Sequence, residues 1–107
     1  MKKYRIKRGD SVPVTLEFKL DGVEVPLAGY TPKLCAKARI TDTAYLFNRN
    51  CDIVLPDTDG IATVTLTPAD TITECKNAIA EALLEDGSGN QRTYLQFLLD
   101  IEGDVNN

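Results

Sequence analysis

The sequence contains no histidine. Histidine is the side chain that most often acts as a general base near neutral pH, and it is also the commonest metal ligand in proteins. Without it, no Ser-His or Cys-His pair is available to activate a nucleophile. We therefore expect a protein that is not an enzyme, with no catalytic residues, no metal ligands and no cofactor.

Cysteine is scarce and unevenly spaced. The three cysteines, Cys35, Cys51 and Cys75, form an odd set whose spacing matches neither a disulfide framework nor a zinc site. We expect buried free thiols in a reducing compartment. A Cys35–Cys51 disulfide is the alternative that the spacing leaves open.

Long apolar stretches are also missing. No segment approaches the roughly 18–20 apolar residues that a membrane-spanning helix needs. Met1 is followed by charged residues rather than by the apolar run of a signal peptide. We therefore expect a protein made in the cytoplasm of its host, with no membrane partner.

Positive charge is in short supply and is concentrated at one end. The net charge of −4 disfavours a nucleic-acid partner, because phosphate binding needs a basic surface. Five of the twelve basic residues nevertheless fall within the first eight positions: Lys2, Lys3, Arg5, Lys7 and Arg8. The remaining chain carries seven basic and sixteen acidic residues, a balance of −9. This basic segment either docks against an acidic neighbour, including a second copy, or keeps a terminal strand from aggregating.

What the sequence does contain is alternation with a period of two residues. Between positions 12 and 20, apolar residues alternate with Pro13, Thr15, Glu17 and Lys19. Successive side chains of a strand point to opposite faces, so this segment presents one apolar and one polar face. Half-buried antiparallel sheets have this pattern. Pro13 lacks an N–H group and indicates either a position at a sheet edge or the start of the strand pairing.

The same alternation recurs along most of the chain. It appears over residues 3–7, 33–40, 61–66 and 94–101, with shorter candidates at 44–48 and 52–55. In the last long segment it assigns Leu95, Phe97, Leu99 and Ile101 to one face and Tyr94, Gln96, Leu98 and Asp100 to the other. Gly-Asp and Asp-Gly pairs separate the segments, and Asp86–Asn90 has the composition of a hairpin loop. Many short strands joined by turns predict an all-β sandwich. We expect residues 1–107 to form one such domain.

The segment between residues 67 and 85 is ambiguous. Thr67-Pro68 is typical of a helix start, and alanine favours helix, so one interpretation is a long helix. The other is one short helical turn near residues 68–74 followed by a strand. The hairpin loop at Asp86–Asn90 favours a strand, because the strand that follows it needs a partner. Thr73–Glu85 therefore stays open between helix and strand, with the short turn as our expectation.

Several short motifs follow one another in a fixed order. They are Arg8–Ser11, Val25–Tyr30, Asp59–Ala62, Thr67–Thr71, Asp86–Asn90 and Glu102–Val105. Their order resembles a family of phage virion proteins that includes the N-terminal domains of baseplate upper proteins and related tail or neck-fibre components. Cys75–Ala78 departs from the family pattern, which has Gly-x-Tyr at that point. The resemblance implies an immunoglobulin-like antiparallel β-sandwich and a structural place in a phage particle or prophage product, without catalytic residues.

Our first hypothesis is a non-enzymatic virion structural or assembly protein, in a baseplate, tail, neck or fibre. Its partners would be other virion proteins or further copies of itself, and we expect a homo-oligomer in the assembled virion. The candidate partner-binding residues are Lys2, Lys3, Arg5, Lys7, Arg8, Tyr45 and Phe47. Charge complementarity and main-chain pairing at a sheet edge would hold the contact.

The alternative hypothesis is a carbohydrate or host-surface recognition module that uses the loops Thr41–Cys51 and Asp86–Asn90. Its stacking surface would come from four aromatic residues, Tyr30, Tyr45, Phe47 and Tyr94, unless these belong to the core. A small hydrolase is the third hypothesis, with Glu81 and Glu85 as a carboxylate pair. On an exposed strand face, however, these glutamates would simply be solvated.

Overall fold

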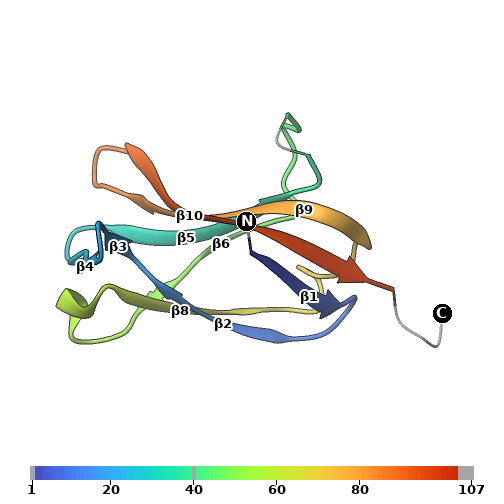
Figure 1. Cartoon of the computed structure of the whole chain (residues 1–107), viewed down its shortest axis with the longest axis horizontal. Coiled ribbons are helices and arrows are strands. Elements are labelled where there is room, and N and C mark those ends of the chain that lie inside the picture. The colour runs from blue at the N-terminus through green and yellow to red at the C-terminus, as the bar shows by residue number, and fades with distance from the viewer. Residues whose placement is uncertain (1, 40, 104–107) are drawn as a thin grey trace.

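The computed structural model describes residues 2–39 and 41–103, which form ten strands and one turn of 3-10 helix (Figure 1). The positions Ile40, Asp104 and Val105, which entered the sequence predictions, lie outside the described residues. Within the described part of the chain, no helix is long and apolar enough to cross a membrane.

The strands form two sheets and a small hairpin. The larger sheet has the order β1-β10-β9-β5-β6, with bounds Lys3–Lys7, Gln91–Glu102, Cys75–Glu85, Thr31–Lys37 and Phe47–Asn50. The smaller sheet has the order β2-β8-β7, with bounds Val12–Glu17, Ile61–Leu66 and Asp52–Ile53. Within the described part of the chain, β3 (Lys19–Leu20) and β4 (Val23–Glu24) pair with each other alone, and the 3-10 turn spans Asp57–Asp59.

The two sheets pack through their apolar faces, as alternation predicts. Leu16 of β2 and Leu66 of β8 are 4% and 2% exposed, and they join Leu34 and Leu84 of the larger sheet in one core. Intervening residues such as Pro13 face outward. The predicted all-β sandwich is therefore confirmed, and its driving force is the burial of one apolar face from each sheet.

The ambiguous segment is a strand. β9 lies between β10 and β5 and pairs antiparallel with both. Ala78, Ala80 and Ala82 are fully buried along its inner face, as the strand interpretation required. The helix interpretation is wrong because hydrogen bonds to two neighbouring strands outweigh the modest helical preference of alanine, roughly 1 kcal/mol or less per residue.

The short helical turn expected near residues 68–74 is misplaced. Pro68–Thr71 form a hydrogen-bonded turn, in which the Asp70 N–H donates to the Thr67 carbonyl at 2.9 Å and the Asp70 carboxylate accepts from the Thr67 N–H at 2.8 Å. The fully buried Thr71 hydroxyl then donates to the Asp10 carbonyl at 2.9 Å. These side-chain bonds close the turn before a helix can propagate. The one helical turn of the described chain lies at Asp57–Asp59.

The sandwich is also not wholly antiparallel. β1 pairs parallel with the C-terminal part of β10, from Lys3 opposite Leu98 to Lys7 opposite Glu102. The chain crosses to the other sheet at Arg8–Asp10, so β1 and β2 do not form the hairpin that would make them antiparallel neighbours. Instead, β1 lies beside β10, and the pair is parallel because the two strands run in the same direction.

The predicted faces of β10 are wrong at Tyr94 and Leu95 because the strand contains a β-bulge. The register between β10 and β9 shifts between Thr93 and Leu95. An extra residue in one strand moves the following side chains to the opposite face. Tyr94 therefore turns inward and packs edge-to-face on Phe18, with ring centroids 5.8 Å apart, while Leu95 stays 36% exposed. From Phe97 onward the predicted inner face is correct.

Candidate functional site

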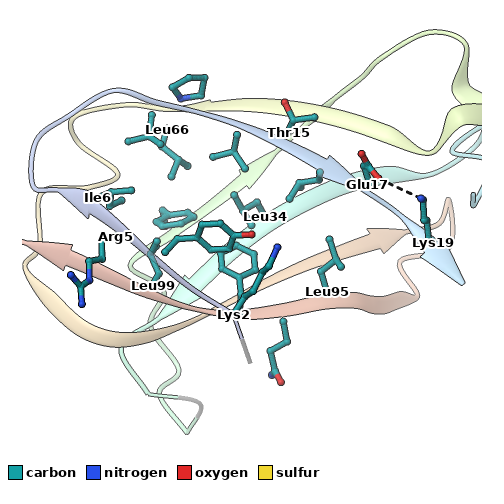
Figure 2. A pocket seen from close by; sticks show the side chains of 18 residues that line it. Lys2, Arg5, Ile6, Thr15, Glu17, Lys19, Leu34, Leu66, Leu95 and Leu99 are labelled. Carbon is teal, nitrogen blue, oxygen red and sulfur yellow. Dashed lines mark ion pairs between the residues drawn. The ribbon is translucent and has the colours of Figure 1, made fainter. Parts of the chain in front are cut away.

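A groove of about 820 Å³ opens along one side of the sandwich, between β1 and β10 of the larger sheet and β2 of the smaller one (Figure 2). β1 and β2 are each the end strand of their sheet. Two sheet edges therefore border the groove.

The floor of the groove is the hydrophobic core itself. Leu34, Phe47, Leu66 and Leu99 line it from below, and each is 5% exposed or less. Figure 2 shows Leu66 and Leu34 between the ribbons of the two sheets. A surface built this way gains free energy when another apolar group covers it.

The wall along β1 and β10 carries larger, exposed apolar groups. Tyr4 is 48% exposed and packs edge-to-face on Phe97, with ring centroids 5.3 Å apart. Leu95 is 36% exposed and projects from β10 further along the same wall. The bulge at Thr93/Leu95 is what places this leucine outside the core. Tyr4 and Leu95 thus offer accessible apolar surface at the mouth of the groove.

On both borders of the groove, some backbone groups have no partner among the described strands. β1 begins to pair with β10 at Leu98, whose N–H donates to the Lys2 carbonyl at 2.8 Å. Over Gln91–Phe97, β10 pairs only with β9 among the described strands. This segment, which we call the open half of β10, leaves one row of N–H and C=O groups available to a further strand.

The edge of β2 is less suited than that of β10 to pairing with a further strand. The N–H of Phe18, just beyond β2, donates to Gly60 at 2.7 Å, toward the partner strand. Because backbone groups alternate in direction along a strand, Pro13 falls on the side away from β8. The prediction that Pro13 marks a sheet edge is confirmed, and its missing N–H removes one donor from that edge.

The rim of the groove is mainly basic. Lys2, Arg5 and Lys19 border it together with one acidic residue, Glu17. Glu17 and Lys19 form an ion pair at 3.6 Å, drawn as a dashed line in Figure 2. Arg5 also lies 3.8 Å from Glu102, so among the described residues Lys2 is the rim cation outside an ion pair, and it favours an acidic partner.

Most of the basic N-terminal segment contacts β10 of the same chain. Lys3 forms an ion pair with Asp100 at 3.3 Å, while Arg5 and Lys7 lie 3.8 Å and 3.5 Å from Glu102. The Arg8 N–H donates to the Glu102 carbonyl at 2.7 Å. The acidic neighbour of these residues is thus an adjacent strand. Lys2 and Arg5 are the members of the set that also border the groove.

Asp100 is the anchor of this arrangement. Its side chain is 4% exposed, and its Oδ1 accepts the Asn77 N–H at 2.8 Å. That hydrogen bond, followed by the nearby Lys3 ammonium, holds the pKa of Asp100 below its usual range. Asn77 adopts a positive φ of 56°, which aims its N–H at the carboxylate. One carboxylate therefore ties β1, β9 and β10 together.

The two predicted aromatic binding residues lie in different environments. Tyr45 is 47% exposed beside Lys37, whose Nζ lies 4.7 Å from the ring centroid. Phe47 is 5% exposed and belongs to the core, so it supports the groove from below and does not present a surface ring. Phe47 stands between the apolar Leu46 and the polar Asn48, so the sequence did not determine which way its ring points. Tyr94 is likewise packed against the core, so the four aromatic residues do not form one stacking surface.

The remaining candidates have structural partners. Glu81 accepts from the Thr93 hydroxyl at 3.1 Å, and Glu85 forms an ion pair with Lys33. Over residues 2–39 and 41–103, no three His, Cys, Asp or Glu residues gather as metal ligands would.

All three cysteines are free thiols. Cys51 lies in the core, whereas Cys35 approaches the Glu81 carbonyl at 3.8 Å. Burial raises the pKa of Cys51 to about 11 and also raises that of Cys35. Both thiols therefore stay protonated and unreactive at neutral pH.

Sequence reasoning did not find the groove. Its lining comes from strands far apart in the chain, and only Pro13, as an edge marker, pointed toward one of its borders. The basic segment was found, but its pairing with Asp100 and Glu102 depends on the parallel β1–β10 contact.

No protein-family model and no curated protein sequence matches the chain. Among solved structures, the N-terminal domain of phage TP901-1 ORF48 matches with a TM-score of 0.64 and 10% identity, over 92% of this chain and 82% of that one. Human T-cell immunoglobulin and mucin domain protein 1 gives a TM-score of 0.45 at 11% identity, over 97% and 100% of the chains. Drosophila OTK extracellular domains 3–5 give 0.43 at 14%, over 97% and 33%. The chain thus shares its fold with a phage protein domain.

Proposed function

We propose that this chain is a non-enzymatic structural domain of a phage or prophage particle, and that it works by docking to protein partners through the groove. The observation that carries the proposal is the fold shared with the N-terminal domain of phage TP901-1 ORF48 over 92% of the chain. The order of turn motifs along the sequence independently resembles that of phage virion proteins. Within the virion, that resemblance favours a baseplate, tail, neck or fibre.

The groove suits a protein partner better than a small polar ligand. Its floor and walls are apolar, whereas its charged groups are confined to the rim. Stable protein interfaces have this arrangement of an apolar centre within a polar border. The open half of β10 would add main-chain hydrogen bonds to the contact.

The proposal is tested by measuring whether the protein is present in purified phage particles. Particles would be induced from the strain that encodes the chain, purified on a density gradient, and analysed by mass spectrometry and immunogold electron microscopy. We expect the chain at a fixed ratio to the other structural proteins, with gold at one site on the tail or neck. Particles from a strain in which the gene is deleted are the control for antibody specificity. Purified, intact particles that lack the chain would refute a virion role.

A further inference from the structure

We propose that the groove binds the β3–β4 hairpin of a second copy of this chain. The inference rests on the proposed function, because it names one partner for the same docking groove. It is based on a second surface of the molecule, the part of the hairpin that follows the rim residue Lys19, Leu20–Glu24, whose chemistry complements that of the groove.

The hairpin presents two apolar side chains to solvent. Leu20 and Val23 lie directly opposite each other and are 44% and 64% exposed. Directly opposed residues of an antiparallel pair point to the same face. The turn between them, Asp21-Gly22, has positive φ values of 53° and 81°, as tight hairpin turns require. The hairpin is therefore a well-defined two-stranded ribbon with one uncovered apolar face.

The hairpin also belongs to an acidic end of the molecule, where its one basic residue, Lys19, forms an ion pair with Glu17 at 3.6 Å. Asp21 and Glu24 form no ion pair within the described residues, and the 3-10 turn adds Asp57 and Asp59 at the same end (Figure 1). The Leu27 N–H donates to the Asp57 carbonyl at 3.0 Å, which fixes that turn beside the segment that follows the hairpin. Acidic groups around an apolar face match a groove with an apolar floor and basic rim.

The open half of β10 provides the second element of fit. One strand of the incoming hairpin can pair with its free backbone edge, while Leu20 and Val23 cover Leu95 and Tyr4. The volume of about 820 Å³ lies within the range of ordinary protein binding pockets and is ample for two aliphatic side chains. Pro13 makes the opposite edge, on β2, the poorer one for pairing.

Two opposite variants test the contact. Leu95→Glu places a negative charge in the groove, and Val23→Lys places a positive charge on the hairpin; both positions are exposed, so folding should be little affected. Sedimentation velocity would follow self-association of the full chain up to about 0.5 mM. We expect the wild-type chain to associate, each variant alone to associate at least about tenfold more weakly, and an equimolar mixture of the two to recover most of the loss.

A matched control separates the contact from general surface effects. Ile72→Glu replaces another exposed aliphatic side chain, 59% exposed, by the same charged one, outside the groove lining, the open half of β10 and the hairpin, and should leave association unchanged. Circular dichroism and thermal unfolding of every variant would verify that the fold is retained.

Two outcomes would overturn the inference: a wild-type chain that remains monomeric throughout, or association that neither variant weakens. If the chain is nevertheless present in purified particles, the proposed function stands and another virion protein occupies the groove. If the hairpin contact is found but the chain is absent from particles, the virion role fails and the self-docking contact remains.

Discussion

The two halves of β10 belong to one strand but differ in strand pairing and in the burial of their aliphatic side chains. Leu98–Glu102 pairs with β1 on one side and follows the β9 ladder on the other. The open half, Gln91–Phe97, pairs with β9 alone among the strands that the structure describes. Ile101 is 1% exposed in the first half and Leu95 is 36% exposed in the second. Leu98–Glu102, which we call the closed half, contributes to the stability of the fold. The open half leaves apolar surface and backbone groups available to a partner.

The difference arises from where β1 begins to pair and from one bulge. Lys3, Arg5 and Lys7 find acidic partners only from Asp100 onward, so ion pairs favour β1 beside the closed half. The bulge before Leu95 then exposes an aliphatic side chain in the open half. The residues that stabilise the fold and those that favour docking thus lie in different halves of one strand. Variants in each half can therefore test the two roles separately.

The largest expected effect comes from the closed half. Ile101→Ala should lower the free energy of unfolding by about 3 kcal/mol, because it leaves a cavity among well-packed core groups. Urea denaturation followed by circular dichroism measures this loss, with the slope of the transition unchanged. A loss below about 1 kcal/mol would mean that this end of the strand is less tightly packed than its burial indicates.

Asp100→Asn tests the anchor between β1, β9 and β10. The folded-state pKa of Asp100 lies below its unfolded value of about 3.9, so the unfolded chain binds more protons between the two values. The stabilising contribution of the carboxylate is therefore present above about pH 4 and is lost as pH falls through the folded pKa. We expect the variant to melt at a lower temperature than wild type near pH 7, with the difference shrinking toward pH 3.

Glu24→Gln is the control for that experiment. It removes one negative charge from an exposed position that forms no ion pair among the described residues. Its melting temperature should follow the wild-type curve with pH. If the Asp100 variant showed a constant offset at every pH, the carboxylate would act through its shape and not through its charge.

Asp86→Ala should loosen the open half while leaving the closed half intact. The Asp86 carboxylate accepts the N–H groups of Ser88 at 2.8 Å and Asn90 at 3.0 Å, which close the β9–β10 turn. The same contacts, led by the Asn90 N–H, hold the pKa of Asp86 below its usual value. Hydrogen exchange should accelerate over residues 86–97 and stay unchanged over 98–102. Uniform acceleration along β10 would show that the two halves open as one unit.

Local side-chain patterns allowed much of the fold to be predicted, because the period of two is visible within any short window. The strands at 3–7, 61–66 and 94–101 follow from it directly. The helix alternative for β9 was not resolved in this way, since its alanines favour helix locally and only pairing with β5 and β10 makes them strand residues.

Features that depend on pairing across the molecule were not predictable. The parallel direction of β1 follows from a partner more than ninety positions away, Leu98 opposite Lys3. The bulge at Thr93/Leu95 has no glycine to mark it, and it reverses the assigned face of Tyr94. Phe47 was expected at a binding surface but lies beneath the groove. The groove itself needs three strands from both ends and both sheets, which no local window contains.

Leu95→Ala carries the smallest expected effect on stability and the most specific effect on docking. The side chain is already 36% exposed, so its removal should change the free energy of unfolding by less than about 1 kcal/mol. Ile101→Ala lies six residues away. The ratio of the losses in free energy of unfolding that the two variants cause measures how far the halves of β10 differ in their contribution to stability. The same variant should weaken self-association, since it removes apolar surface from the groove wall. Equal losses of stability at the two positions would show that Leu95 supports the fold and that the open half is no more specialised for docking than its neighbour.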